Sequence, residues 1–227
     1  MPRGKLSKGK CAYCDLEFTR RGVAKHLNFC PQRLDAVTKA TEKKRRPISL
    51  YHLHIQAVGI SAYWMELEME GTATLEILDD YLRDIWLECC DHMSGFYAGG
   101  RYRGEIRMSQ KVDSIFAPGV KLTHIYDFGT ESETLVKVLG VRVGHSVTPH
   151  PIALMARNMI PVGECIDCGQ PASWFCLKCL YEDEVWGTLC DEHVKTHPHA
   201  EEYELVQLAN SPRFGVCGYT GPAEPPY

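Results

Sequence analysis

The feature that most constrains this chain is a run of cysteines and histidines between residues 165 and 199. Each CxxC turn aims two thiolates at one point, and Zn²⁺ in structural sites is held by four sulfur or nitrogen ligands in a tetrahedron. Eight such ligands within thirty-five residues predict two closed structural zinc sites. The ligands, in chain order, are Cys165, Cys168, Cys176, Cys179, Cys190, His193, His197 and His199.

The order of these ligand pairs predicts how they share two ions. In a cross-braced module, the first and third pairs bind one zinc while the second and fourth pairs bind the other. The pattern is similar to B-box and related treble-clef fingers. Cys217 lies next to glycines that permit a knuckle turn, and it is an alternative to His197 or His199 as a ligand. The expected first site is Cys165, Cys168, Cys190 and His193, and the expected second site is Cys176, Cys179, His197 and His199.

A third set of metal-type residues lies near the N-terminus. Cys11-x2-Cys14 is followed by eleven residues and then by His26-x3-Cys30. The His and the Cys at positions i and i+4 share one face of a helix, so both can point at one ion. This spacing resembles a zinc finger of the Cys-Cys-His-Cys type. It predicts a third structural zinc, bound by Cys11, Cys14, His26 and Cys30.

The same N-terminal segment is strongly basic. Residues 1–47 hold thirteen Lys or Arg against four Asp or Glu, a net charge of +9, and the remainder has a net charge of −13. A helix is expected from about residue 20 to Cys30, with Thr19 as its N-cap and Pro31 at its end. Basic side chains on and before this helix suit contact with phosphates. The predicted nucleic-acid contacts are Lys8, Lys10, Arg20, Arg21 and Lys25; a protein-docking finger and a solvated basic tail are the alternatives.

The middle of the chain, residues 48–160, predicts an α+β domain. Alternating apolar residues indicate strands over 48–58 and 63–70, joined as a hairpin around Gly59, with the glutamates of the second strand in water. An apolar stripe indicates a helix from about Leu75 to Cys89 with its acidic side in solvent. Short strands are expected near residues 96–98, 104–108, 122–126 and 134–143. The predicted fold class is α+β: a mostly antiparallel sheet with one main packed helix, and small zinc-stabilised modules at both ends.

Two short motifs carry a family resemblance for residues 48–143. The stretch His92-Met-Ser-Gly-Phe96 follows a Leu-rich helix that ends in Trp86, and Tyr126-Asp-Phe-Gly129 comes later. Together they resemble the plasmid ORF-three-like family, often filed as the passenger protein of an insertion element under a resolvase label. Members usually continue the second motif with an acidic residue, Trp and His, where this chain has residues 130–134. The resemblance implies an α+β fold and an association with mobile elements.

Candidate catalytic residues are few. The chain has no Gly-rich phosphate loop, Gly-x-Ser-x-Gly elbow or His-Glu-x-x-His helix. Ser94 and the arginines of residues 101–107 are the candidate cluster for a recombinase centre. We interpret these arginines instead as a solvent-exposed rim. His92 and Asp127 are the best polar pair for a pocket, although Asp127 also fits a turn former. Three histidines, His52, His54 and His124, are candidates to line the same sheet and would form a metal site if they converged.

These features predict a non-enzymatic, zinc-binding protein in three parts. Residues 1–47 form a basic zinc finger and linker that binds DNA, 48–160 the α+β domain, and 161–227 an acidic two-zinc module with a disordered Pro-rich tail. About three structural Zn²⁺ ions are expected. A protein partner would dock on the body or on the C-terminal module, and the protein would be a mobile-element accessory. The alternatives are a pure protein–protein adaptor and a nuclease or recombinase-like enzyme.

The expected compartment follows from the cysteines and from hydropathy. No secretory leader pattern opens the sequence, and no apolar run reaches about 18 residues. We therefore expect a cytoplasmic protein without a membrane segment. In a reducing compartment, CxxC pairs are more often metal ligands than disulfides.

Overall fold

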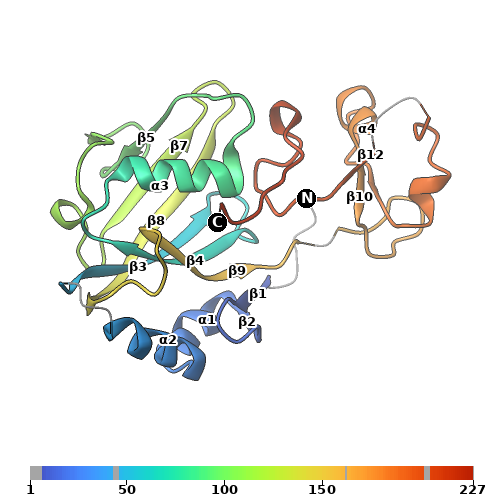
Figure 1. Ribbon diagram of the computed structural model, residues 1–227. Coiled ribbons are helices and arrows are strands. Elements are labelled where there is room, and N and C mark those ends of the chain that lie inside the picture. Colours follow the sequence, from blue (N-terminus) through green and yellow to red (C-terminus); the bar gives the residue numbers. More distant parts are fainter. Residues whose placement is uncertain (1–6, 43–45, 162, 202–204, 227) are drawn as a thin grey trace.

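The fold is organised around one large antiparallel sheet. The computed structural model describes residues 7–42, 46–161, 163–201 and 205–226. Nine strands hydrogen-bond in the order β2-β1-β9-β4-β3-β8-β7-β5-β6 (Figure 1), which confirms the α+β class. Their bounds are β1 Lys8–Cys11, β2 Glu17–Thr19, β3 Ile48–Ala57, β4 Trp64–Glu70, β5 Ser94–Tyr97, β6 Glu105–Ile106, β7 Lys121–Tyr126, β8 Ser132–Gly144 and β9 Ile152–Asn158.

The main core lies between this sheet and one helix. Strands β3 and β4 form the expected hairpin, and Gly59 in its turn has a φ of +80°, which glycine adopts without steric strain. Alternate residues of the hairpin, such as Leu53 and Leu67, are fully buried. They belong to one apolar cluster with Leu75, Leu78 and Leu82 of α3 (Leu75–Leu82), which covers this face of the sheet (Figure 1).

The helix differs from its prediction in its second half. The α-helix ends at Leu82, and one turn of π-helix, η1 (Arg83–Leu87), follows and stops two residues short of the predicted end at Cys89. The expectation that its acidic residues face water is wrong for Asp79. This carboxylate is buried, lies 2.6 Å from His124 Nε2 and accepts a hydrogen bond from Arg83 Nε at 2.7 Å. Burial raises the pKa of Asp79, but these partners outweigh it and hold the pKa below its usual value.

The opposite face of the sheet is also covered, which corrects the prediction that the glutamates of β4 face water. Helices α1 (Arg20–Leu27) and α2 (Pro31–Thr41) lie against it (Figure 1). Glu68 is 3% exposed and binds Arg33 of α2 at 3.0 Å and Arg142 of β8 at 2.5 Å. A buried carboxylate needs such partners. The alternation of residues in β4 predicts which face of the sheet the glutamates lie on. It does not predict that α2, which is distant in the sequence, covers that face and supplies Arg33.

The N-terminal segment shares its sheet with the middle of the chain. Strand β1 pairs with β9, a strand that the sequence did not predict, and Gly9 lies opposite Asn158. Trp64 of β4 is fully buried in a small second core with Val23 and Leu27 of α1. The expected boundary near residue 47 stays a prediction, but the finger and the body are joined by hydrogen-bonded strands.

The helix predicted in the N-terminal segment begins at its predicted N-cap but ends earlier than predicted. Thr19 is the N-cap of α1, and its hydroxyl accepts a hydrogen bond from the Gly22 amide at 3.2 Å. The helix stops at Leu27, not at Cys30. Pro31 begins α2 instead, where the missing amide proton costs nothing because the first turn of a helix has no partner for it. The basic linker segment 43–45 lies outside the described residues.

The C-terminal part forms a second, three-stranded sheet in the order β11-β10-β12. Its strands are β10 (Trp174–Cys176), β11 (Thr188–Leu189) and β12 (Leu205–Gln207), and its helical turns are α4 (Leu177–Tyr181), η3 (His193–Lys195) and, further on, η4 (Val216–Gly218). No helix within the described ranges is both long and apolar enough to cross a bilayer.

The segment after β12 returns to the body, while the disorder expected for residues 221–227 stays a prediction. Ser211 Oγ donates to the carbonyl of Trp86 at 2.5 Å. The guanidinium of Arg157 donates to the carbonyls of Asn210 and Ala223, and Ala223 is 3% exposed. Burial lowers the pKa of Arg157 to about 10, and these carbonyls serve the guanidinium in place of a carboxylate. The sequence does not indicate which backbone carbonyls of a Pro-rich segment will accept hydrogen bonds from a buried arginine.

The junction between β1 and β9 can be tested at Gly9. A Cβ on this residue would lie 2.2 Å from the Arg157 carbonyl oxygen and 2.5 Å from the Trp64 ring. We expect Gly9→Ala to lower the free energy of unfolding by about 1–3 kcal/mol, because overpacking forces the strands apart. Gly140→Ala is the matched control, since nothing lies within 4 Å of its Cβ position. Equal urea midpoints for the two variants would contradict the close approach.

Candidate metal centres

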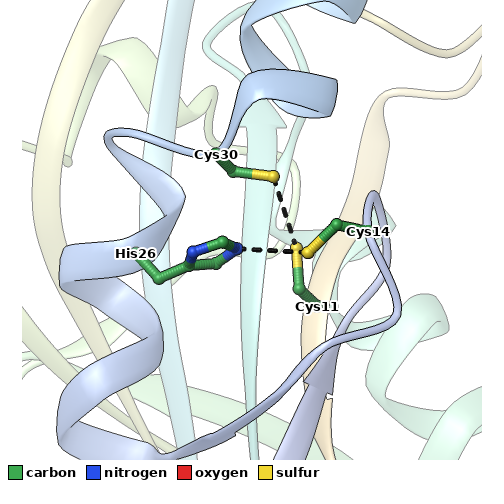
Figure 2. A group of neighbouring side chains, drawn as sticks. All are labelled: Cys11, Cys14, His26 and Cys30. Atoms are coloured by element: carbon green, nitrogen blue, oxygen red, sulfur yellow. Dashed lines mark hydrogen bonds between the residues drawn. The ribbon is translucent and has the colours of Figure 1, made fainter.

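The first candidate centre joins four side chains from three elements. Cys11 ends β1, Cys14 lies in the turn after it, His26 is on α1 and Cys30 caps α2. Figure 2 shows the four side chains converging, with the Cys14 Sγ 3.3 Å from His26 Nε2 and the sulfurs of Cys11 and Cys30 3.9 Å apart. The ring of Phe18 stacks on His26 with centroids 4.0 Å apart, which fixes the orientation of the imidazole.

The second and third centres lie in the C-terminal module, in the grouping that the cross-braced order predicts. In the second, His193 Nδ1 lies 3.7 Å from Cys165 Sγ and 3.3 Å from Cys190 Sγ, and Cys168 completes the set. In the third, Cys179 Sγ lies 3.3 Å from His197 Nε2 and 3.5 Å from His199 Nδ1. Cys176, at the end of β10, is its fourth member.

The distances within these sets match a tetrahedral metal site. With metal–sulfur bonds of about 2.3 Å and metal–nitrogen bonds of about 2.0 Å, the sulfurs lie about 3.8 Å apart and sulfur and nitrogen about 3.5 Å apart. The shortest separations between ligand atoms run from 3.3 to 3.9 Å, and all the ligand atoms of each set lie within 4.8 Å of one another. A disulfide would bring two sulfurs to about 2.05 Å. The three Cys/His clusters can therefore each hold one metal ion.

The two cluster thiols with strongly raised pKa values need a neighbouring cation in order to ionise. Burial raises the pKa of the Cys11 thiol to about 11, although backbone amides of Tyr13 and Cys14 oppose it. Burial and the neighbouring Cys176 raise the pKa of Cys179 to about 12. Gly187 lets the chain pass close to this third cluster, because a Cβ there would lie 2.6 Å from the Cys179 Cβ. Such thiols become thiolates at neutral pH only when a positive charge is next to them.

Cys217, the alternative C-terminal ligand, does not lie with either cluster of its module. The structure places it beside His92 and Asp127, on the body. The reason is the path of the chain: after β12 it leaves the module, and Arg213 anchors it by donating to Asp127 Oδ2 at 2.5 Å. The third cluster is completed by both His197 and His199.

Asp127 acts as a turn former and as an ion-pair partner. Its Oδ1 accepts from the amides of Gly129 and Thr130 at 3.0 and 3.1 Å, and its Oδ2 from the fully buried Arg213. Burial raises the pKa of Asp127, but these donors outweigh it and lower the pKa to about 2. His92 Nε2 lies 3.5 Å from the same carboxylate. The predicted pair is therefore together, but Asp127 is fully occupied.

The three histidines considered as a sheet-lining set do not converge. His52 and His54 of β3 lie 2.8 and 2.7 Å from the oxygens of Glu66, on the face covered by α1 and α2. His124 faces α3 and pairs with Asp79. Burial raises the pKa of Glu66, and the hydrogen bonds of its two histidines reverse the shift and lower it. Glu66 and Arg213 are the polar core residues that sequence patterns missed, because each is defined by a partner far away in the chain.

The side chains predicted to contact nucleic acid differ in whether they already bind other protein groups. Lys8 and Lys10 lie 3.6 and 3.5 Å from Glu17 and Asp15, and Arg20 donates to Gln56 at 2.6 Å. Two others, Arg21 and Lys25, are exposed one turn apart on α1. Within the part of the chain that the structure describes, these two make no ion pair.

One hollow on the body lies away from the predicted pocket. It measures about 1070 Å³ and is lined mainly by acidic side chains of α3 and η1 with aromatic residues opposite, and neither His92 nor Asp127 lines it. Ser94, the candidate nucleophile, accepts a hydrogen bond from Arg83 at 3.0 Å at its edge. Arg101 pairs with Glu131, and Arg103 and Arg107 are exposed, as expected for a rim.

Comparisons with known proteins give only distant structural likenesses. No family model matches the chain, and no curated protein matches it. The fold is similar to the crystal structure of a protein of unknown function from Methanosarcina mazei Go1, at 16% identity and a TM-score of 0.42, over 54% of this chain and 75% of that chain.

The Arg213–Asp127 pair generates a prediction about acid stability. Because the folded pKa of Asp127 is below its ordinary value, the stability it contributes is complete above about pH 4 and is lost as the pH falls toward 2. We expect Asp127→Asn to lower the free energy of unfolding by about 3 kcal/mol at pH 7, since it leaves a buried guanidinium without its charge partner. Urea denaturation at several pH values should show this difference shrinking between pH 4 and 2.

Asp35→Asn is the control for that experiment. Asp35 forms an exposed ion pair with Lys39 on α2, so its loss should change the free energy of unfolding by less than about 1 kcal/mol. An Asp127→Asn variant that behaves like this control at every pH would contradict the assigned ion pair.

Proposed function

We propose that this chain is a non-enzymatic, three-zinc binding protein whose metals hold small modules in shape at both ends. The observation that carries the proposal is that twelve side chains fall into three four-membered Cys/His sets with tetrahedral spacing. Four protein ligands leave no position for a water molecule, whereas catalytic zinc keeps one open. The sets therefore fit structural sites.

The donor atoms favour zinc over other ions. Two sets have three thiols and one imidazole, and the third has two of each. Soft thiolates with imidazoles in a tetrahedron are typical of Zn²⁺, while Mg²⁺ and Ca²⁺ require oxygen ligands. The apolar cores of the metal-binding modules are also small. The core of the N-terminal module has few buried apolar residues besides its own cysteines. Metal binding supplies the free energy that such a core lacks, on the order of 10 kcal/mol per structural zinc.

For the partner, we propose nucleic acid, contacted through the surface of α1. Arg21 and Lys25 are exposed together there, on a helix fixed by the first metal centre and by strand pairing. A single finger covers about 3 base pairs. The binding would therefore be weak and directed mainly at the phosphate backbone.

An adaptor that binds only proteins is the second candidate. It is favoured by apolar residues exposed beside the first centre, Phe29 at 71% and Leu16 at 59%. The acidic composition of the C-terminal module also suits a protein surface more than DNA. The family resemblance of the body and its link to mobile elements stay predictions.

Metal counting tests the structural part of this proposal. Protein treated with a mild chelator, to strip weakly held ions, should keep three zinc ions in native mass spectrometry. Cys14→Ser should keep two and unfold more easily, because it removes one thiolate of the first set. Ser146→Ala, at an exposed hydroxyl, is a neutral control. A wild-type protein that holds no zinc and resists strong chelators would contradict the proposal.

Salt-dependent binding tests the nucleic-acid part. We expect the double variant Arg21→Gln/Lys25→Gln to bind duplex DNA at least tenfold more weakly at low salt. The slope of log Kobs against log salt should fall in magnitude by about 1.8, since each phosphate contact contributes about 0.9. Lys39→Gln, on the neighbouring helix α2, is the matched control. No binding by the wild-type protein at low ionic strength would favour the adaptor instead.

A further inference from the structure

A fourth group of metal-type side chains lies on the body, away from the three Cys/His clusters. Cys89 and Cys90 follow η1, and His92 comes two residues later. Their ligand atoms lie within 4.8 Å of one another. Cys217, from the segment that returns after β12, lies within the same distance of His92. Two groups, Cys89 with Cys90 and His92, and His92 with Asp127 and Cys217, therefore share His92 where two distant parts of the chain touch.

The neighbouring carboxylate serves the group without being free to bind an ion. Both oxygens of Asp127 are already acceptors, for two amides and for Arg213. The carboxylate also lies 3.5 Å from His92 Nε2, a nitrogen that is buried. A carboxylate next to a ligating histidine orients the ring and raises its basicity. An ion bound here would draw its ligands from both groups: the thiols of Cys89 and Cys90, the imidazole of His92, and the thiol of Cys217.

Arg213 supplies the charge that such a set requires. Its guanidinium is fully buried and donates to the Cys89 sulfur at 3.2 Å and to the Cys217 sulfur at 3.5 Å. Three thiolates and one neutral imidazole around a divalent ion have a net charge of −1, and the guanidinium, which also pairs with Asp127, places a positive charge next to it. Donors to ligating sulfurs are a common outer layer of thiolate sites.

The backbone holds Cys217 toward this point. Cys217 has a φ of +52°, in the left-handed region, between Gly215 at +81° and Gly218 at +71°. A non-glycine residue in this conformation is uncommon and marks a functional constraint more often than chance. The carbonyl of Gly215 accepts a hydrogen bond from Tyr181 at 2.6 Å, which fixes one side of the turn.

We propose that Cys89, Cys90, His92 and Cys217 form a fourth Zn²⁺ site. It is more exposed than the other three, because two of its thiols, Cys90 and Cys217, are open to solvent, whereas Cys168 is the one exposed thiol in the other sets. Its ion is therefore the first to exchange with the surroundings. The bound ion ties the C-terminal segment to the body, so occupancy of this site controls how firmly the acidic module is held.

Stoichiometry separates this site from the other three. In native mass spectrometry, wild-type protein in excess zinc should hold four ions and fall to three in a mild chelator. The double variant Cys90→Ser/Cys217→Ser should hold three ions in both conditions. Because both thiols are exposed, the variant should keep the wild-type urea midpoint in the chelator. Met93→Ser, at the exposed residue beside His92, is the control and should hold four.

A second readout checks the ligands directly. With zinc present, alkylation of Cys90 and Cys217 should be at least tenfold slower than in the mild chelator, as measured by peptide mass spectrometry. Three ions in the wild-type protein, or four in the double variant, would overturn the site. So would a disulfide between Cys217 and Cys89 or Cys90 that forms with no uptake of metal. If the three Cys/His clusters bound no zinc but the fourth site did, the result would be different. The wild-type protein would then hold one zinc ion, and the double variant would hold none.

Discussion

The convergence of soft ligands from separate segments is the constraint on which both ends of this chain depend. In the first cluster, a strand end, a turn, a helix and the start of a second helix meet at one point. In the C-terminal module, two loops interlock because alternate ligand pairs share a centre. Neither region has an apolar core large enough for independent stability. The internal shape of the helical segment with Arg21 and Lys25, and that of the acidic module, therefore both follow from ligand geometry.

A layer of buried ion pairs then sets how the N-terminal segment sits on the body. Glu68 receives one arginine from α2 and another from β8, and Glu66 receives two histidines of β3. These groups pair in one register only, because a shift by one residue would leave a carboxylate buried without a partner. These charge pairs fix the orientation of the N-terminal segment on the body. Strand pairing between β1 and β9 and the burial of Trp64 stabilise the contact between the two parts.

The parts of the structure that sequence predicts are those written in local patterns. Alternation located β3 and β4, the apolar stripe located α3, and ligand spacing located the three clusters. The failures have a common physical cause. Glu68, Asp79 and Asp127 were interpreted as solvent or turn residues, since the partners Arg33, His124 and Arg213 are each far away along the chain. β9 was missed because prolines frame it, and Cys217 was misplaced because the path of its segment is fixed by tertiary contacts.

Zinc K-edge X-ray absorption on the purified protein tests the central claim most directly. Averaged over the three clusters, eight sulfurs and four nitrogens give about 2.7 sulfurs and 1.3 nitrogens per zinc, at about 2.3 and 2.0 Å. A fourth Cys₃His site leaves this average nearly unchanged. A spectrum dominated by sulfur at that distance is the predicted result. A first shell of oxygen and nitrogen with no sulfur contribution would contradict the account.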